Sequence, residues 1–239
     1  LYKLIMLVKY YDSFLLKKPK IIIILLFIIL VSAINFSKHF QLDASSETLL
    51  IEGDPDLAYL NKINERYNSK EFLVLTFTPR KSMISDQSIN SLLSLKYKLQ
   101  SLEWVHSVVT LLDVPLLNST DDTLTDKLKN FSTLKSEGIN REKGFREILE
   151  SPVFKNFVVS EDGKTSGIIV YIKEDKKIKS IKNKKELIEY KELKKKQNHD
   201  NILEIREVIK DYSKVSKIHL GGIPMIADDM MSFIKNDIF

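Results

Sequence analysis

The sequence contains no cysteine, so it offers no disulfide framework, no thiolate metal site and no cysteine nucleophile. Its four histidines, His39, His106, His199 and His219, stand far apart without another histidine or an acid at ligand spacing, so we expect no metal site. The glycines at 221–222 lack the GxxxxGK[ST] context of a phosphate-binding loop, and we expect no cofactor. No Ser/His/Asp spacing indicates a catalytic triad, so we do not expect an enzyme.

One long apolar run is present, the eleven consecutive residues from Ile21 to Val31. At about −0.3 to −0.6 kcal/mol per residue, this run favours membrane insertion by about 3 to 6 kcal/mol. The stretch to Phe36 would form about 24 Å of helix against a hydrocarbon core of about 30 Å, a mismatch that a thinned bilayer tolerates. We predict a retained transmembrane helix over 21–37. The alternative is a signal peptide, because Val31-Ser32-Ala33 offers small residues to a peptidase.

The charge that precedes this run predicts its orientation. Residues 1–20 carry five lysines against one acid, Asp12, and this excess places the N-terminus in the cytoplasm. Residues from about 38 onward would then lie outside the cytoplasmic membrane. Apolar residues recur at near-helical spacing within 1–20, so we predict a basic amphipathic segment on the inner surface of the lipid bilayer, with ordinary terminal fraying as the alternative.

The net charge of +5 does not indicate a nucleic-acid partner. Besides residues 1–20, the excess comes from 173–198, which carries eleven lysines against five acids, and the remainder is mildly acidic. Nucleic acid is not expected outside the cytoplasm. We interpret 173–198 as a solvated, lysine-rich insertion. A helix is one form open to it, because it contains no glycine or proline and carries Lys–Glu pairs four residues apart. Contact with lipid headgroups or a partner is the alternative.

Hydrophobic periodicity predicts an α+β domain after the apolar run. Strands are expected at 71–78, 104–111, 154–160, 165–172 and 217–220, and helical segments at 55–64, 85–102, 123–134, 141–149, 202–212 and from 224 onward. Gly163 gives the third and fourth strands a hairpin signal. A βαβ unit, a hairpin, a helix and a strand in this order are typical of the split βαβ, ferredoxin-like fold.

The segment Gly221-Gly222-Ile223-Pro224 predicts a sharp turn between the last strand and an amphipathic helix opened by Pro224. Glycine permits such a turn because it reaches positive φ without a side-chain clash. Asp228 and Asp229 are expected in the first turn of that helix, where carboxylates favour the positive end of the helix dipole.

Several segments in this order resemble the resistance-nodulation-division (RND) superfamily: a basic N-terminus, one span, LEWVHSV (102–108), VSEDGK (159–164) and LGGIPMI (220–226). The similarity is closest to the predicted exporters related to the mycobacterial large membrane proteins. In that family the first transmembrane helix precedes an extracytoplasmic porter domain of ferredoxin-like pieces. The resemblance implies a porter domain over 38–222 and, over 223–239, a helix leading toward a second transmembrane helix.

The resemblance also implies function and partners. The chain would be the N-terminal part of an exporter of lipidic or other hydrophobic compounds, and its partners would be the remaining transporter and its substrate, with a homo-oligomer as a further option. Family members relay protons through ionisable residues in later spans, and 21–34 contains none, so this part alone would not transport. Gly221, Gly222 and Pro224 would couple porter and membrane. The alternative is an anchored or secreted extracytoplasmic binding module.

Overall fold

The computed structural model describes residues 19–37, 55–67, 70–117, 131–175 and 177–238. Two compact units divide the chain, residues 1–43 and 44–239. The predicted amphipathic segment 1–20 lies almost wholly outside the described residues.

Helix α2, Pro19–Ser37, is the described part of the first unit. Proline at its first position suits a helix start, where its missing N–H costs no hydrogen bond. The window Pro19–Phe36 has a mean hydropathy of 2.5, and none of it is buried. Nineteen residues form about 28 Å of helix. By length and composition α2 is able to cross a membrane, and it begins two residues before the predicted start.

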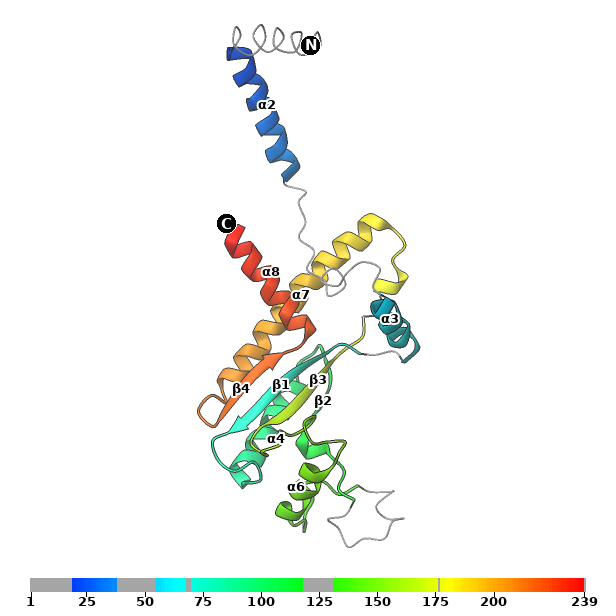
Figure 1. Cartoon of the computed structure of the whole chain (residues 1–239), viewed down its shortest axis with the longest axis vertical. Coiled ribbons are helices and arrows are strands. Elements are labelled where there is room, and N and C mark those ends of the chain that lie inside the picture. Colours follow the sequence, from blue (N-terminus) through cyan, green and yellow to red (C-terminus); the bar gives the residue numbers. More distant parts are fainter. Residues whose placement is uncertain (1–18, 38–54, 68–69, 118–130, 176, 239) are drawn as a thin grey trace, which may run out of the picture. The chain divides into compact units, whose positions relative to one another are not determined.

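The second unit is built around a four-stranded antiparallel sheet. Its strands are β1 (Phe72–Pro79), β2 (Val105–Val109), β3 (Ser166–Ile172) and β4 (Ser216–Gly221). Their order across the sheet is β2-β3-β1-β4, and every neighbouring pair is antiparallel. β1 and β2 therefore run parallel to each other on either side of β3 (Figure 1). The predicted α+β class is confirmed.

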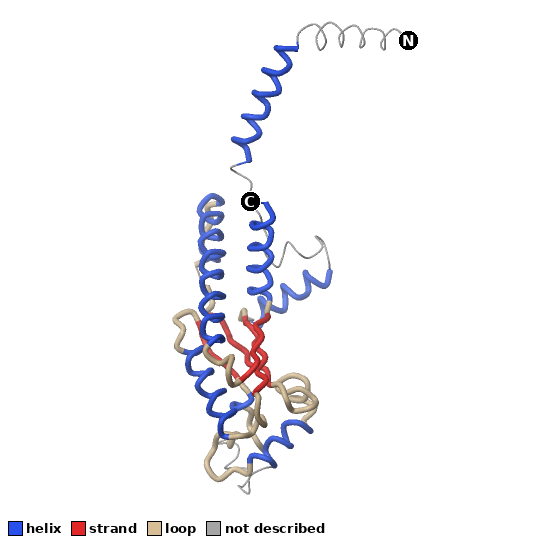
Figure 2. Tube along the Cα trace, turned by 90° about the vertical axis from the view of Figure 1, so that its left-hand side faces the viewer, coloured by secondary structure: helices blue, strands red, loops and turns tan. Residues whose placement is uncertain are grey.

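Two helices cover one face of this sheet. Helix α4 (Asp86–Gln100) links β1 to β2 and begins at Ser85, whose side chain accepts a hydrogen bond from the backbone N–H of Ser88. Helix α7 (Lys184–Lys210) links β3 to β4 and packs beside α4 on the same side of the strands (Figure 2). The core lies between these helices and the sheet and includes Leu73, Leu75, Phe77, Leu92, Leu95, Leu99, Ile168, Val170, Ile202 and Ile205.

Helix α7 joins most of the lysine-rich stretch, for which a helix was one of the expected forms, to the helix expected at 202–212. Ile202 and Ile205 in its second half are fully buried, whereas most of its first half is exposed. The preceding connection is attached to this first half through Asp175, which accepts hydrogen bonds from Tyr190 and pairs with Lys194 at 2.7 Å. Partial burial opposes ionisation, but the partners Lys194 and Tyr190 lower the pKa of Asp175 overall.

The predicted strand at 154–160 is wrong. The segment forms turns, and the carbonyl of Phe154 accepts hydrogen bonds from the backbone N–H groups of Phe157 and Val158. Only a single antiparallel bridge, Val159 to Ser166, remains beside the start of β3, because β2 pairs with β3 from Ile169 onward. The turn at Gly163 is confirmed by its φ of +69°.

The remaining elements are shorter. Helix α3 spans Pro55–Tyr67 and helix α6 spans Arg141–Glu150, close to their predicted positions. The predicted helix at 123–134 falls mainly outside the described residues, and its described end, 131–134, is not helical. The second strand stops earlier than predicted, because Thr110 caps a short 3-10 turn, Leu111–Asp113.

Candidate functional site

The junction between β4 and α8 is the candidate site that the sequence indicates. Helix α8, Ile223–Ile238, begins two residues after the end of β4, with Pro224 in its first turn. Gly222 has a φ of +118°, so the positive φ expected at this turn is present. Its carbonyl accepts the first helical hydrogen bond, from the backbone N–H of Ile226 at 3.0 Å. Gly222 alone therefore makes the change of direction from strand to helix.

Gly222 also lies very close to the first residues of β1. A Cβ atom at this position would lie 3.1 Å from the carbonyl oxygen of Phe72 and 3.2 Å from the Cα atom of Leu73. Gly221 differs, because it pairs with Val74 in the sheet and an added Cβ would lie 3.7 Å from the Val74 carbonyl oxygen, an ordinary contact. The start of α8 is thus in direct contact with the backbone of a central strand.

Polar contacts attach α8 to α7 beyond this turn. Asn198 donates a hydrogen bond to the carbonyl oxygen of Pro224 at 2.8 Å. Nδ1 of His199 lies 2.9 Å from a carboxylate oxygen of Asp228, whose side chain is only 7% exposed. These contacts join segments separated by almost thirty residues, so no local sequence pattern reveals them.

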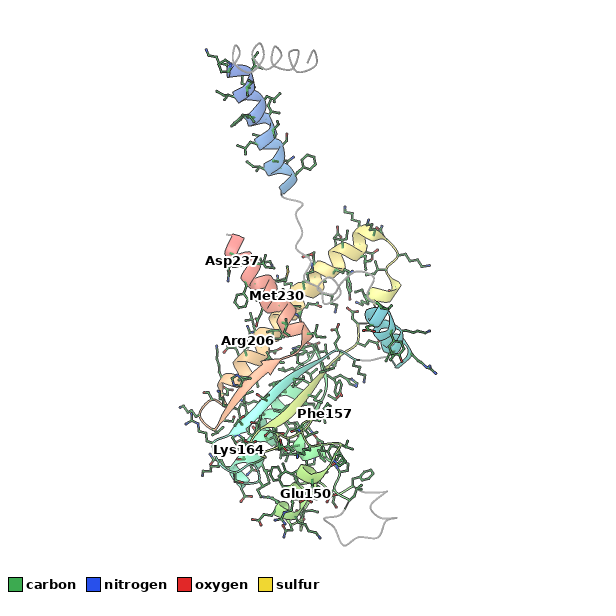
Figure 3. The ribbon with its side chains drawn as sticks, viewed as in Figure 1. Glu150, Phe157, Lys164, Arg206, Met230 and Asp237 are labelled. Carbon is green, nitrogen blue, oxygen red and sulfur yellow. The ribbon has the colours of Figure 1, made fainter. Side chains whose placement is uncertain are left out.

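A third contact places the second acid of α8 against the same helix. Arg206, which Figure 3 labels, donates to both carboxylate oxygens of Asp229 at 2.7 and 2.9 Å. The expectation that Asp228 and Asp229 occupy the first turn of the helix is wrong, because α8 has no acid there. Their carboxylates instead pair with the basic side chains of α7, and this pairing fixes which face of α8 points outward.

The outward face of α8 is apolar. Ile223, Ile226 and Phe233 are 63%, 49% and 65% exposed, and Met230 between them is half-buried. Their spacing of three, four and three residues places them on one side of the helix. The junction thus combines a rigid turn on β1, a polar attachment to α7 and an exposed apolar stripe, which we define as Ile223, Ile226, Met230 and Phe233.

The three histidines within the described residues do not form a cluster. His106 lies 2.7 Å from Nζ of Lys70, His219 is exposed on β4, and His39 lies outside the described residues. Within the described residues, no group of three or more His, Asp or Glu side chains is arranged to hold a metal ion. An open polar depression of about 650 Å³ lies where α4 and α6 begin, and it is lined in part by Lys135 and Arg141.

No protein-family model matches the chain, and no curated protein is significantly similar to it. The features of the chain that bear on its function are the apolar helix, the topology of the sheet and the β4–α8 junction.

Proposed function

We propose that the chain is the N-terminal part of an RND-type exporter of lipidic or hydrophobic compounds. In this proposal α2 is the first transmembrane helix, and the second unit is an extracytoplasmic porter domain of ferredoxin-like fold. The observation that carries it is the strand order β2-β3-β1-β4, with α4 and α7 as connections, which is the order expected for a split βαβ domain. A helix apolar enough to span a membrane precedes that domain.

The junction supports a coupling role within this proposal. The turn at Gly222 leaves no space between α8 and β1, and the pairs to His199 and Arg206 hold α8 against α7. A displacement of α8 would therefore move the sheet and its covering helix together, since packed elements transmit strain. In the exporter α8 would connect the porter domain to the next span. The ionisable groups of a proton relay would lie in other spans, because residues 21–34 contain none.

Two measurements test the proposal. Alkaline carbonate extraction should leave the protein in the membrane fraction, and protease added to intact spheroplasts should digest the second unit. Deletion of the complete gene should cause a lipidic compound, detected by comparative lipid extraction of the cell and its envelope, to accumulate inside. Release of a soluble fragment beginning near Ile34 would contradict the anchor. An unchanged lipid distribution would favour the anchored binding module instead.

A further inference from the structure

We propose that the second unit docks on the outer surface of an anionic bilayer through its projecting end, which we define as residues 184–198 of α7 together with α8. The inference rests on the proposed function only for its assumption that α2 stays in the membrane. Both views show the first half of α7 and all of α8 extending past the same end of the sheet, the end where β4 finishes (Figures 1 and 2). This end carries an apolar helix side, which suits the acyl-chain boundary of a membrane, and exposed lysines, which suit its anionic headgroups.

The apolar stripe of α8 provides the first kind. Three of its four members, Ile223, Ile226 and Phe233, are exposed although the opposite side of the helix is held by polar pairs, with Asp228 only 7% exposed against α7. Since α8 is fixed by these pairs and by Gly222, it cannot rotate its stripe into the core. A helix with one apolar side and one polar side is the form that binds at the boundary between headgroups and acyl chains.

Lysines of α7 provide the second kind. Residues 184–198 contain six lysines against the acids Glu186, Glu189 and Glu192. Lys194 and Lys195 are paired with Asp175 and Glu192, respectively. Four others are exposed, Lys184, Lys185, Lys191 and Lys196. Exposed lysines beside an apolar helix are attracted to anionic headgroups within about a Debye length of the surface.

We propose a bilayer rather than a second protein as the binding partner because α2 keeps the second unit close to the membrane. Seventeen residues, 38–54, separate α2 from α3, and even a fully extended chain of that length reaches only about 60 Å. A unit tethered in this way meets the membrane surface at a high effective concentration, so even modest individual contacts suffice for docking.

The absence of cysteine makes the test direct, because one introduced cysteine is the sole labelling site. Asp237→Cys places a fluorophore on the exposed end of α8 and leaves the stripe intact. Val153→Cys labels an exposed position three residues after Glu150, the last residue of α6, and Glu150 lies at the opposite end of the sheet from Asp237 (Figure 3). The full-length chain is inserted into nanodiscs of zwitterionic lipid with about a third of phosphatidylglycerol. Quenching is then measured with lipids that carry a nitroxide near the headgroup.

Docking predicts quenching at Asp237→Cys at least threefold stronger than at Val153→Cys. Replacing the four exposed lysines by glutamine, or Phe233 by serine, should reduce that quenching by half or more, while the fluorescence spectrum of the sole tryptophan stays unchanged. Equal quenching at the two labels would overturn the proposal, as would energy transfer between donor- and acceptor-labelled copies of the Asp237→Cys variant in one disc. A normal lipid distribution after gene deletion would refute export and leave docking standing, so the two failures are distinguishable.

Discussion

Substitution of Gly222 by alanine perturbs the junction with the smallest possible side chain. A residue other than glycine at a φ of +118° costs about 1 to 3 kcal/mol. Its Cβ would also lie 3.1 Å from the Phe72 carbonyl oxygen and 3.2 Å from the Leu73 Cα atom, and these are backbone atoms of a central strand that do not move easily. Overpacking of this kind adds about 1 to 3 kcal/mol. Together the two effects should lower the free energy of unfolding by about 2 to 6 kcal/mol.

Gly221→Ala is the matched control for this substitution. It adds the same methyl group one residue earlier, where the nearest atom, the Val74 carbonyl oxygen, lies 3.7 Å away. We expect a change within about 1 kcal/mol, because alanine loses less conformational entropy than glycine on folding.

Urea unfolding of the full chain in detergent measures both variants. The only tryptophan, Trp104, is a suitable fluorescent probe, because it donates a hydrogen bond to Glu204 of α7 at 2.8 Å and reports the packing of that helix on the sheet. Equal unfolding free energies for Gly222→Ala and Gly221→Ala would refute the structural reasoning. In the proposed exporter, unchanged export per folded molecule would refute the coupling role alone.

Three further predictions concern stability. Asp113→Asn should lower the unfolding free energy at pH 7 and flatten its decline below about pH 4. Burial opposes ionisation of Asp113, but hydrogen bonds, chiefly from Lys96, lower its pKa overall. The stability that the carboxylate contributes is therefore complete above its pKa in the unfolded chain and is lost as the pH falls through its pKa in the folded protein. Arg206→Ala should cost at most about 1 kcal/mol in urea unfolding, because its pair with Asp229 is partly exposed. Ile205→Ala, at a fully buried site, should cost about 2 to 5 kcal/mol in the same assay.

Elements with a clear local pattern were predictable from the sequence. The apolar run at 21–31 predicted α2, and the alternation and helical spacing between 71 and 102 predicted β1 and α4, including the buried faces of Leu92 and Leu95. The positive φ of Gly222 followed from the need for a sharp turn. Each of these features depends on residues close together in the chain.

Features that depend on distant residues were not predictable. Whether 154–160 joins the sheet depends on how far β2 extends along β3, and here only Val159 forms a bridge to it. The pairs of α7 with Asp228 and Asp229 depend on how two helices cross. A helix in the lysine-rich stretch had a local signal, the absence of glycine and proline, but its continuity with the helix expected at 202–212 was not predicted.

The central proposal is that α2 and the α+β unit belong to an exporter, and the reading frame beyond the codon for Phe239 tests it most directly. Sequencing the genomic DNA downstream should show a second apolar span shortly after α8, further spans with ionisable residues inside some of them, and a second loop with the same order of strands and helices. A reading frame that ends without any further apolar span would contradict the claim.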